Sequence, residues 1–217
     1  MAGDVGRGHE VIKLGGWHHL ESMKQGISPA QRVRLAMDGD VQAWEQLAVT
    51  WLPTVHSWCL RLGGPRLDAG DLTQEVFIIA FTRLHALRDP QAFPAWIFGI
   101  TRREVLRQGR RAWLRRWVPG LEPEEPVSTV GPDADAERTQ LVREVQAVLQ
   151  RLPLAQREVL VLCDVDERTS AEVATMLGVP HGTVRSRLRL ARARFRKEAA
   201  GRLPSAPPSD WVNGEAT

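Results

Sequence analysis

The chain has 217 residues, of which 43% are hydrophobic, and its formal net charge is +3. This length and apolar content suit one large or two small domains with true cores, and no apolar run is long enough for a membrane-spanning helix. The first residues lack the basic-then-apolar layout of a secretory signal, so we expect a cytoplasmic protein. Cys59 and Cys163 lie far apart without a CxxC pair, which favours two free thiols over a disulfide or a metal site.

The first half of the chain has a helical pattern. Residues 1–28 show no sustained period, and we expect a loose tail there. The segment "GDVQAWEQLAVTWL" then places apolar residues on one face behind Asp40, a suitable N-cap, and we expect Pro53 to open a further helix that ends at "GGP". Asp68 is the expected N-cap of the next helix, and "RDPQAF" separates that helix from "PAWIFGITRREVLRQGRRAWLRRW".

Charge is distributed in blocks of one sign. Residues 102–117 contain seven arginines and one acid, residues 121–137 contain six acids and no base, and residues 185–197 contain seven bases and no acid. Solvated helix faces usually mix signs, so two basic blocks indicate a polyanion such as nucleic acid that is held at two places. The proline-rich acidic stretch between them predicts a flexible linker.

The second basic block lies in a helix-turn-helix pattern. Helical periodicity returns near Asp135, and Pro153 separates two short helices. In "SAEVATMLGVPHGTVRSRLRLARARF", small Ala174 permits a close helix crossing, Gly178 suits the end of the first helix, and Thr183 is a candidate cap of the second. The inward face of that second helix is predicted to hold Val184, Leu188 and Ala191.

The outward face of this helix is basic. It is predicted to hold Arg185, Ser186, Arg189 and Arg192, with Arg187 nearer the boundary, where it would reach a phosphate. One helix fits the major groove of DNA, where arginine reads guanine edges and other basic groups neutralise phosphates. The pattern therefore predicts DNA binding rather than an ordinary helical hairpin with a basic surface.

The motifs occur in an order that resembles one family. The segments "DAGDLTQEVFIIAF", "FPAWIFGITRREVLRQGRR", "RLPLAQREVLVL" and "GVPHGTVRSRLRLAR" resemble those of an extracytoplasmic-function sigma factor of the sigma-70 family. The resemblance covers residues 29–200, and the ordered set is more specific than any single motif. It implies a protein that binds core RNA polymerase and directs initiation at a subset of promoters.

The resemblance implies an all-α fold with two small helical domains. It places a sigma-2-like domain at residues 29–117, a flexible acidic linker at 118–135, a sigma-4-like helix-turn-helix domain at 136–200 and a disordered tail at 201–217. The segment 85–111 would melt and read the −10 element, and the helix 183–192, supported by the helix of Glu158 and Val159, would read the −35 element.

The resemblance also assigns site residues. Polymerase binding falls to Asp71, Leu72, Gln74 and Glu75. Contact with −10 DNA falls to Arg102, Arg103, Arg107 and Arg110, and contact with −35 DNA to Thr183, Arg185, Ser186, Arg187, Arg189 and Arg192. Phe93 and Trp96 could stack on bases, although the spacing of Trp96 favours core packing. Gly70, Arg103, Arg107 and Arg189 depart from residues common in the family, which leaves the preferred −10 and −35 sequences open.

The implied partners are the β′ clamp helices and β flap of core RNA polymerase, promoter DNA and an anti-sigma factor. Neither a small-molecule substrate, a cofactor, a metal nor catalytic residues are expected. An alternative is a stand-alone helix-turn-helix regulator, which the 71–77 and 102–116 segments argue against. A metal-dependent nuclease built on His18, His19, Asp68 and Asp71 is a third reading, but adjacent histidines in a loose tail make a poor ligand set.

Overall fold

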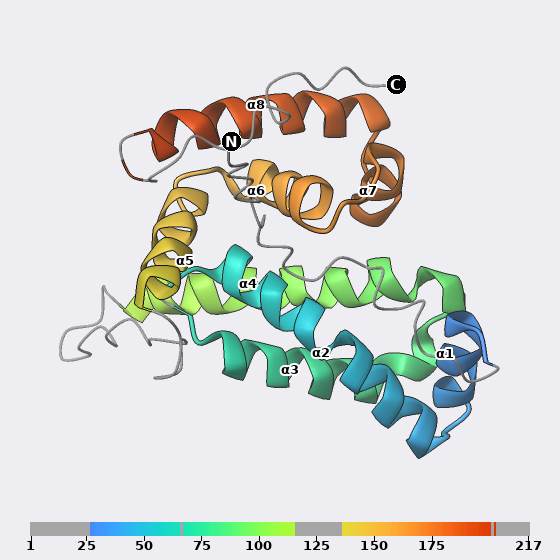
Figure 1. Ribbon diagram of the computed structural model, residues 1–217. Helices are drawn as coiled ribbons and strands as arrows, with labels where there is room; N and C mark the ends of the chain where they lie inside the picture. The colour runs from blue at the N-terminus through green and yellow to red at the C-terminus, as the bar shows by residue number, and fades with distance from the viewer. Residues whose placement is uncertain (1–26, 66, 116–135, 201, 203–217) are drawn as a thin grey trace, which may run out of the picture.

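The computed structural model describes residues 27–65, 67–115, 136–200 and 202, and within these ranges it is helical without a strand (Figure 1). Almost all of the predicted tails, the predicted linker, His18 and His19 lie outside the described residues. The longer helices are α1 (Pro29–Met37), α2 (Val41–Gly63), α3 (Ala69–Arg83), α4 (Phe93–Arg115), α5 (Ala136–Leu149), α6 (Leu154–Leu160), α7 (Ser170–Leu177) and α8 (His181–Ala199). Short 3-10 turns at Leu84–Ala86 and Pro90–Ala92 join α3 to α4, and a π-helical turn at Val161–Val165 follows α6.

Local capping starts the helices where the sequence predicts. The Asp40 carboxylate accepts from the Ala43 amide at 3.0 Å, and the Asp68 carboxylate accepts from the Asp71 amide at 2.8 Å. These bonds satisfy amides that have no partner within the helix. Both predicted N-caps are therefore confirmed.

The proline at position 53 does not open a helix, so that prediction was wrong. It lies inside α2, which runs unbroken from Val41 to Gly63. Buried residues continue on one face through the proline, namely Leu47, Trp51, Val55, Trp58 and Leu62. Pro53 itself is exposed on the opposite side, where water can bind the carbonyl that its missing N–H leaves unpaired. Packing of the buried face therefore outweighs the local break signal.

The core of α1–α4 is rich in aromatic rings. The indole of Trp58 is fully buried and meets Phe98 edge-on, with ring centroids 5.0 Å apart. Phe93 is buried against Trp51 at 5.4 Å, whereas Trp96 is only partly buried and packs on Phe93 at 5.7 Å. The structure thus uses both predicted aromatics of the 85–111 segment for packing.

The two halves of the molecule pack directly against each other (Figure 1). Val159, Leu162, Val173 and Val184 of the second half belong to the same buried cluster as the core of α1–α4. A smaller cluster around Val148, Leu160, Ala191 and Phe195 holds α5, α6 and α8 together. The two halves of the described chain therefore share one buried cluster.

The helix-turn-helix at α7 and α8 follows its sequence signals except at one residue. Thr169 and Glu172 form a reciprocal capping box at the start of α7, and Gly178 ends α7 with a left-handed φ of 63°. The predicted cap Thr183 is wrong, because α8 begins at His181 after Pro180. The Thr183 amide instead donates to the carbonyl of Pro180 at 2.9 Å.

Candidate nucleic-acid interface

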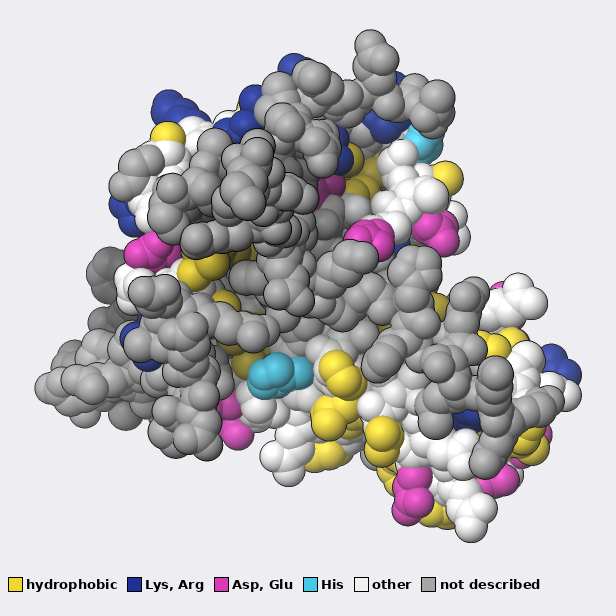
Figure 2. Space-filling model, viewed as in Figure 1, with side chains coloured by type: hydrophobic (Ala, Val, Ile, Leu, Met, Phe, Trp, Pro, Cys, Tyr) yellow, Lys and Arg dark blue, Asp and Glu magenta, His cyan; other side chains and the backbone are white. Residues whose placement is uncertain are grey.

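The predicted recognition helix presents a basic face. Val184 and Ala191 are fully buried and Leu188 is partly buried, as the periodicity predicts, whereas Arg185, Ser186 and Arg189 are exposed. No ion pair involves Arg185, Arg187 or Arg189 within the part of the chain that the structure describes. Figure 2 shows Lys and Arg side chains gathered at the top of the view, over α8.

Arg192 differs from its neighbours on α8. Its guanidinium makes a two-pronged contact with the Asp164 carboxylate, with Nε at 3.0 Å from Oδ2 and Nη2 at 2.8 Å from Oδ1. The hydrogen bonds that Arg192 donates to Asp164 raise the pKa of Arg192. Because the Asp164 side chain is only 3% exposed, this pair anchors α8 to the turn after α6. The assignment of Arg192 to the outward face is therefore wrong, since its guanidinium is committed to the protein.

The predicted −10 arginines are divided between the protein and the surface. Arg103 and Arg110 are exposed. Arg102 reaches the second half of the molecule, where its Nε lies 2.5 Å from Oε1 of buried Glu158. Burial raises the pKa of Glu158, and Arg102 opposes that shift.

Arg107 joins α4 to α3. Its Nε lies 2.6 Å from Oε2 of Glu104, which is itself buried, and its Nη2 lies 3.1 Å from Oε1 of Glu75. The Glu104 hydrogen bond is the main cause of the raised pKa of Arg107. A predicted −10 residue is thus linked to Glu75, a predicted polymerase-binding residue on α3. No local pattern in the sequence indicates this link.

The predicted polymerase-binding residues do not share one surface. Asp71 and Gln74 are exposed and Glu75 is partly exposed, whereas Leu72 is fully buried under α3. Leu72 supports this surface from the core and cannot touch a partner in the structure described. The apolar period of α3 explains the difference, because Leu72 shares the buried face with Val76.

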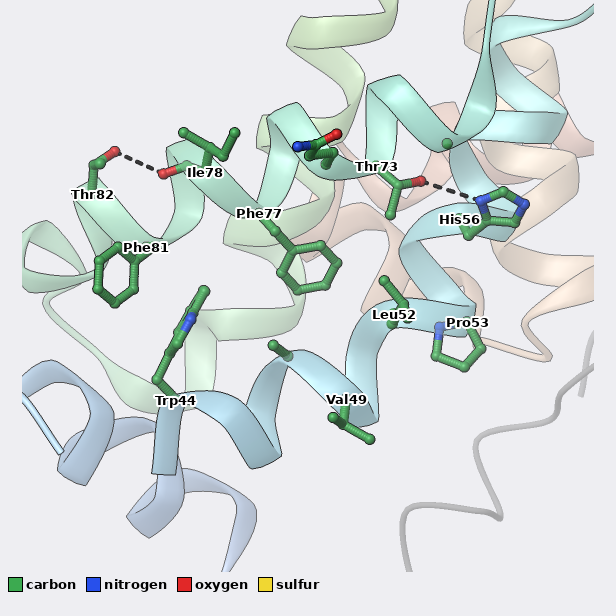
Figure 3. A pocket seen from close by; sticks show the side chains of 13 residues that line it. Trp44, Val49, Leu52, Pro53, His56, Thr73, Phe77, Ile78, Phe81 and Thr82 are labelled. Atoms are coloured by element: carbon green, nitrogen blue, oxygen red, sulfur yellow. Dashed lines mark hydrogen bonds between the residues drawn. The ribbon is translucent and has the colours of Figure 1, made fainter. Parts of the chain in front are cut away.

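A large apolar groove between α2 and α3 was not expected from the sequence (Figure 3). Its volume is about 830 Å³, and the rings of Trp44, Phe77 and Phe81 meet along it, with Trp44 and Phe81 centroids 5.3 Å apart. Phe81 lines this groove and is 58% exposed. Exposed Val49 and Leu52, which break the period of α2, are the sequence signal that could have indicated the groove.

Comparison with known families decides between the readings. Residues 47–116 match the family model for sigma-70 region 2, and residues 142–195 match that for sigma-70 region 4. The ECF RNA polymerase sigma factor SigM of Mycobacterium tuberculosis is 31% identical over 169 residues, which cover 77% of this chain and 83% of SigM. The chain belongs to the extracytoplasmic-function sigma factors. It is an alternative sigma factor that directs promoter-specific transcription, and the stand-alone regulator is not favoured.

Two other relatives are also named ECF RNA polymerase sigma factors. SigE of Mycolicibacterium smegmatis is 33% identical over 71% of this chain, a match that spans 60% of SigE, and SigW of Bacillus subtilis is 25% identical over 77% of this chain and 95% of SigW. Two solved structures share the fold. CnrH in complex with the cytosolic domain of CnrY matches at a TM-score of 0.60 and 24% sequence identity, and the match covers 77% of this chain and 94% of CnrH. The sigma factor RpoE in complex with the anti-sigma factor NepR from Bartonella quintana matches at a TM-score of 0.61 and 22% sequence identity, and the match covers 74% of this chain and 99% of RpoE.

We next consider metal sites, membrane spans and the two cysteines of the sigma factor. Among the described residues, no cluster of His, Cys, Asp or Glu could hold a metal ion, and no helix has the length and hydropathy to cross a membrane. Cys59 and Cys163 are free thiols, and burial raises the pKa of Cys59 to about 11 and that of Cys163 to about 12. Such thiols are almost wholly protonated at neutral pH and react slowly.

Proposed function

We propose that α8 of this sigma factor reads the −35 element in the major groove. The observation that carries the proposal is the exposed face of Arg185, Ser186 and Arg189, which lies opposite the buried Val184 and Ala191. Because one face of this helix packs against the core and the opposite face is exposed, its guanidinium groups can reach base edges without strain. Arg187 would neutralise a phosphate beside this face.

We propose that the segment 85–111 melts and reads the −10 element. Exposed Arg103 and Arg110 on α4 would follow the phosphates of the separated strand, with Arg102 and Arg107 joining them only when their carboxylate partners release them. Flipping a base out of the stack costs a few kcal/mol, so a cationic channel is needed to hold the strand.

The polymerase surface is proposed to lie on α3. Asp71 and Gln74 are exposed there, and Glu75 is partly exposed, which suits pairing with basic groups of the β′ clamp helices. We propose that the second half contacts the β flap and that an anti-sigma factor can cover these surfaces, a role that the NepR and CnrY complexes of the fold relatives support. The protein would act where the polymerase acts, in the cytoplasm, and would leave the catalytic chemistry to it.

Run-off transcription tests this function. Core RNA polymerase is mixed with the protein and sheared genomic DNA of the source organism, and the transcript starts are sequenced. Discrete starts that share −35 and −10 motifs, and that are absent without the protein, are expected. Asp71→Ala should abolish them, and Glu45→Ala, which changes an exposed carboxylate on α2, is the matched control. Unchanged starts with Asp71→Ala would contradict the polymerase assignment.

A further inference from the structure

A large apolar side chain, that of Leu190, lies on the exposed side of α8. Leu190 is 47% exposed, whereas the apolar residues that fix α8 to the rest of the protein, such as Val184 and Phe195, are almost wholly buried. Among the described residues, Leu190 belongs to neither buried cluster. The core therefore does not use this side chain, and a partner that covered it would remove apolar surface from water.

The surroundings of Leu190 on the helix are basic or small. In an α-helix the side chains three and four positions away are the nearest neighbours. For Leu190 these neighbours are Ser186, Arg187, Ala193 and Arg194. None of the four is acidic, and the Ser186 hydroxyl donates to the Thr183 carbonyl at 3.0 Å, which folds it back on its own helix. Leu190 thus forms a small apolar spot within a basic surface.

This apolar spot shares the proposed DNA-reading face of α8. Leu190 follows Ser186 by four residues, and Arg189 follows Arg185 by four, so two rows of side chains run next to each other along the helix. One row offers guanidinium groups, and the other offers a short hydroxyl and an apolar branch. Arg192 does not compete for this face, because its guanidinium is held in an ion pair within the protein.

The chemistry of a leucine selects one of the four bases. Leucine has neither a donor nor an acceptor, so it cannot hydrogen-bond to the polar groups that guanine, adenine and cytosine present in the major groove. Thymine presents a C5-methyl group there, and apolar contact with this methyl is one way in which proteins read a base. Against cytosine, a leucine would cover the N4 amino group without giving it a partner, which is unfavourable.

We propose that Leu190 is a specificity-determining residue that contacts the C5-methyl group of a thymine in the −35 element. This inference rests on the proposed function, because it applies only if α8 lies in the major groove of that element. The arginine row reads the hydrogen-bonding edges of bases, and Leu190 reads an apolar group that no arginine can recognise. The −35 element must then contain an A·T pair whose methyl group faces α8.

Replacement of thymine by deoxyuridine tests this contact, because deoxyuridine lacks only the C5-methyl group and pairs as thymine does. Promoter duplexes carry the replacement at a single thymine of the −35 element, taken in turn on both strands. Binding of the holoenzyme that contains the full-length chain is measured for the parent and for Leu190→Ala. Alanine is a strong helix former and the position is exposed, so this variant keeps α8 intact.

For the parent, we expect one of these replacements to weaken binding by about fourfold, as for the loss of one buried methyl group. Leu190→Ala should bind the thymine duplex at least as weakly as the parent binds the deoxyuridine duplex, and it should lose most of the difference between the two. Leu35→Ala, which shortens a leucine that is 38% exposed on α1, is the matched control and should keep the difference.

The methyl contact is overturned by a −35 element without an A·T pair, or by a parent that no deoxyuridine replacement weakens. It is also overturned if Leu190→Ala keeps the full difference between the duplexes while it binds all of them more weakly, since Leu190 would then contact polymerase or the DNA backbone. Arg185→Ala in the same assay separates this inference from the proposed function. A changed base preference in Arg185→Ala without any deoxyuridine effect refutes the methyl contact alone. If neither variant alters binding at −35, α8 does not read that element and the proposed function itself is refuted.

Discussion

The basic blocks on α4 and α8 are alike in composition but differ in what their arginines touch. On α8, Arg185 and Arg189 are exposed, and within the described residues Arg192 is the arginine that forms an ion pair, with Asp164. On α4, Arg102 and Arg107 are both paired, with Glu158, Glu104 and Glu75. A run of arginines in the sequence is therefore not a uniform basic surface, because buried carboxylates hold some of the guanidinium groups against the protein. Among the described residues, the proposed DNA-reading face of α8 is therefore largely free of ion pairs, whereas that of α4 is partly held by carboxylates.

The largest expected effect concerns stability within α8. Arg192→Ala leaves Asp164 buried without its partner, and we expect a loss of about 3 kcal/mol in the free energy of unfolding. Arg185→Ala removes an exposed, unpaired group and should change it by less than about 0.5 kcal/mol. Urea unfolding followed by circular dichroism measures both. Equal losses would remove the distinction between paired and free arginines on this helix.

DNA affinity should show the reverse order within α8. Arg185→Ala should weaken −35 binding by about 1–3 kcal/mol and relax the preference at about one base pair. The measurement is binding of the holoenzyme to promoter duplexes that vary one position at a time. An equal loss on every sequence would reassign Arg185 to phosphate contact, as we expect for Arg103→Ala on α4.

Stability should also depend on pH through Asp166. Burial raises the pKa of Asp166 from 3.8 to about 6, although Trp58, Arg61 and Arg168 oppose the shift. A folded-state pKa above the unfolded value means that this contribution is fully present below about pH 4 and is lost as pH rises through about 6. We expect the unfolding free energy to lose about 2 kcal/mol of this contribution between pH 4 and 7, since one pKa unit corresponds to about 1.4 kcal/mol. The readout is the difference in unfolding free energy between the parent and Asp166→Asn from pH 4 to 7, and a difference that rises with pH would contradict this sign.

The smallest effect should come from the link between α3 and α4. Glu75→Gln weakens the half-exposed pair with Arg107, but buried Glu104 still holds the guanidinium. We therefore expect affinity for single-stranded −10 DNA to rise by no more than about 0.5 kcal/mol, as for exposed ion pairs. Fluorescence anisotropy with a labelled strand measures it, and Glu45→Gln is the control. A much larger gain would mean that Glu75, rather than Glu104, restrains Arg107.

The structure confirms several predictions that depend on residues close together in the sequence. The Asp40 and Asp68 caps, the left-handed Gly178 and the inward positions of Val184 and Ala191 depend on neighbours within a turn or two. Short-range hydrogen bonds and helical periodicity leave a signal that one segment carries by itself. The ordered motifs likewise indicated the sigma-factor family.

The sequence by itself thus determined the helices, the helix-turn-helix and the family. Only the tertiary structure decided that α2 continues through Pro53, that Leu72 is buried, and which arginines remain free. Hydrogen bonds between the two halves join residues far apart in the chain: Trp58 and Asp166 are 108 residues apart, and Arg102 and Glu158 are 56 apart. A buried carboxylate pairs with the basic side chain that the fold places next to it. Packing between the two halves determines which side chain that is, and no local sequence pattern encodes this packing.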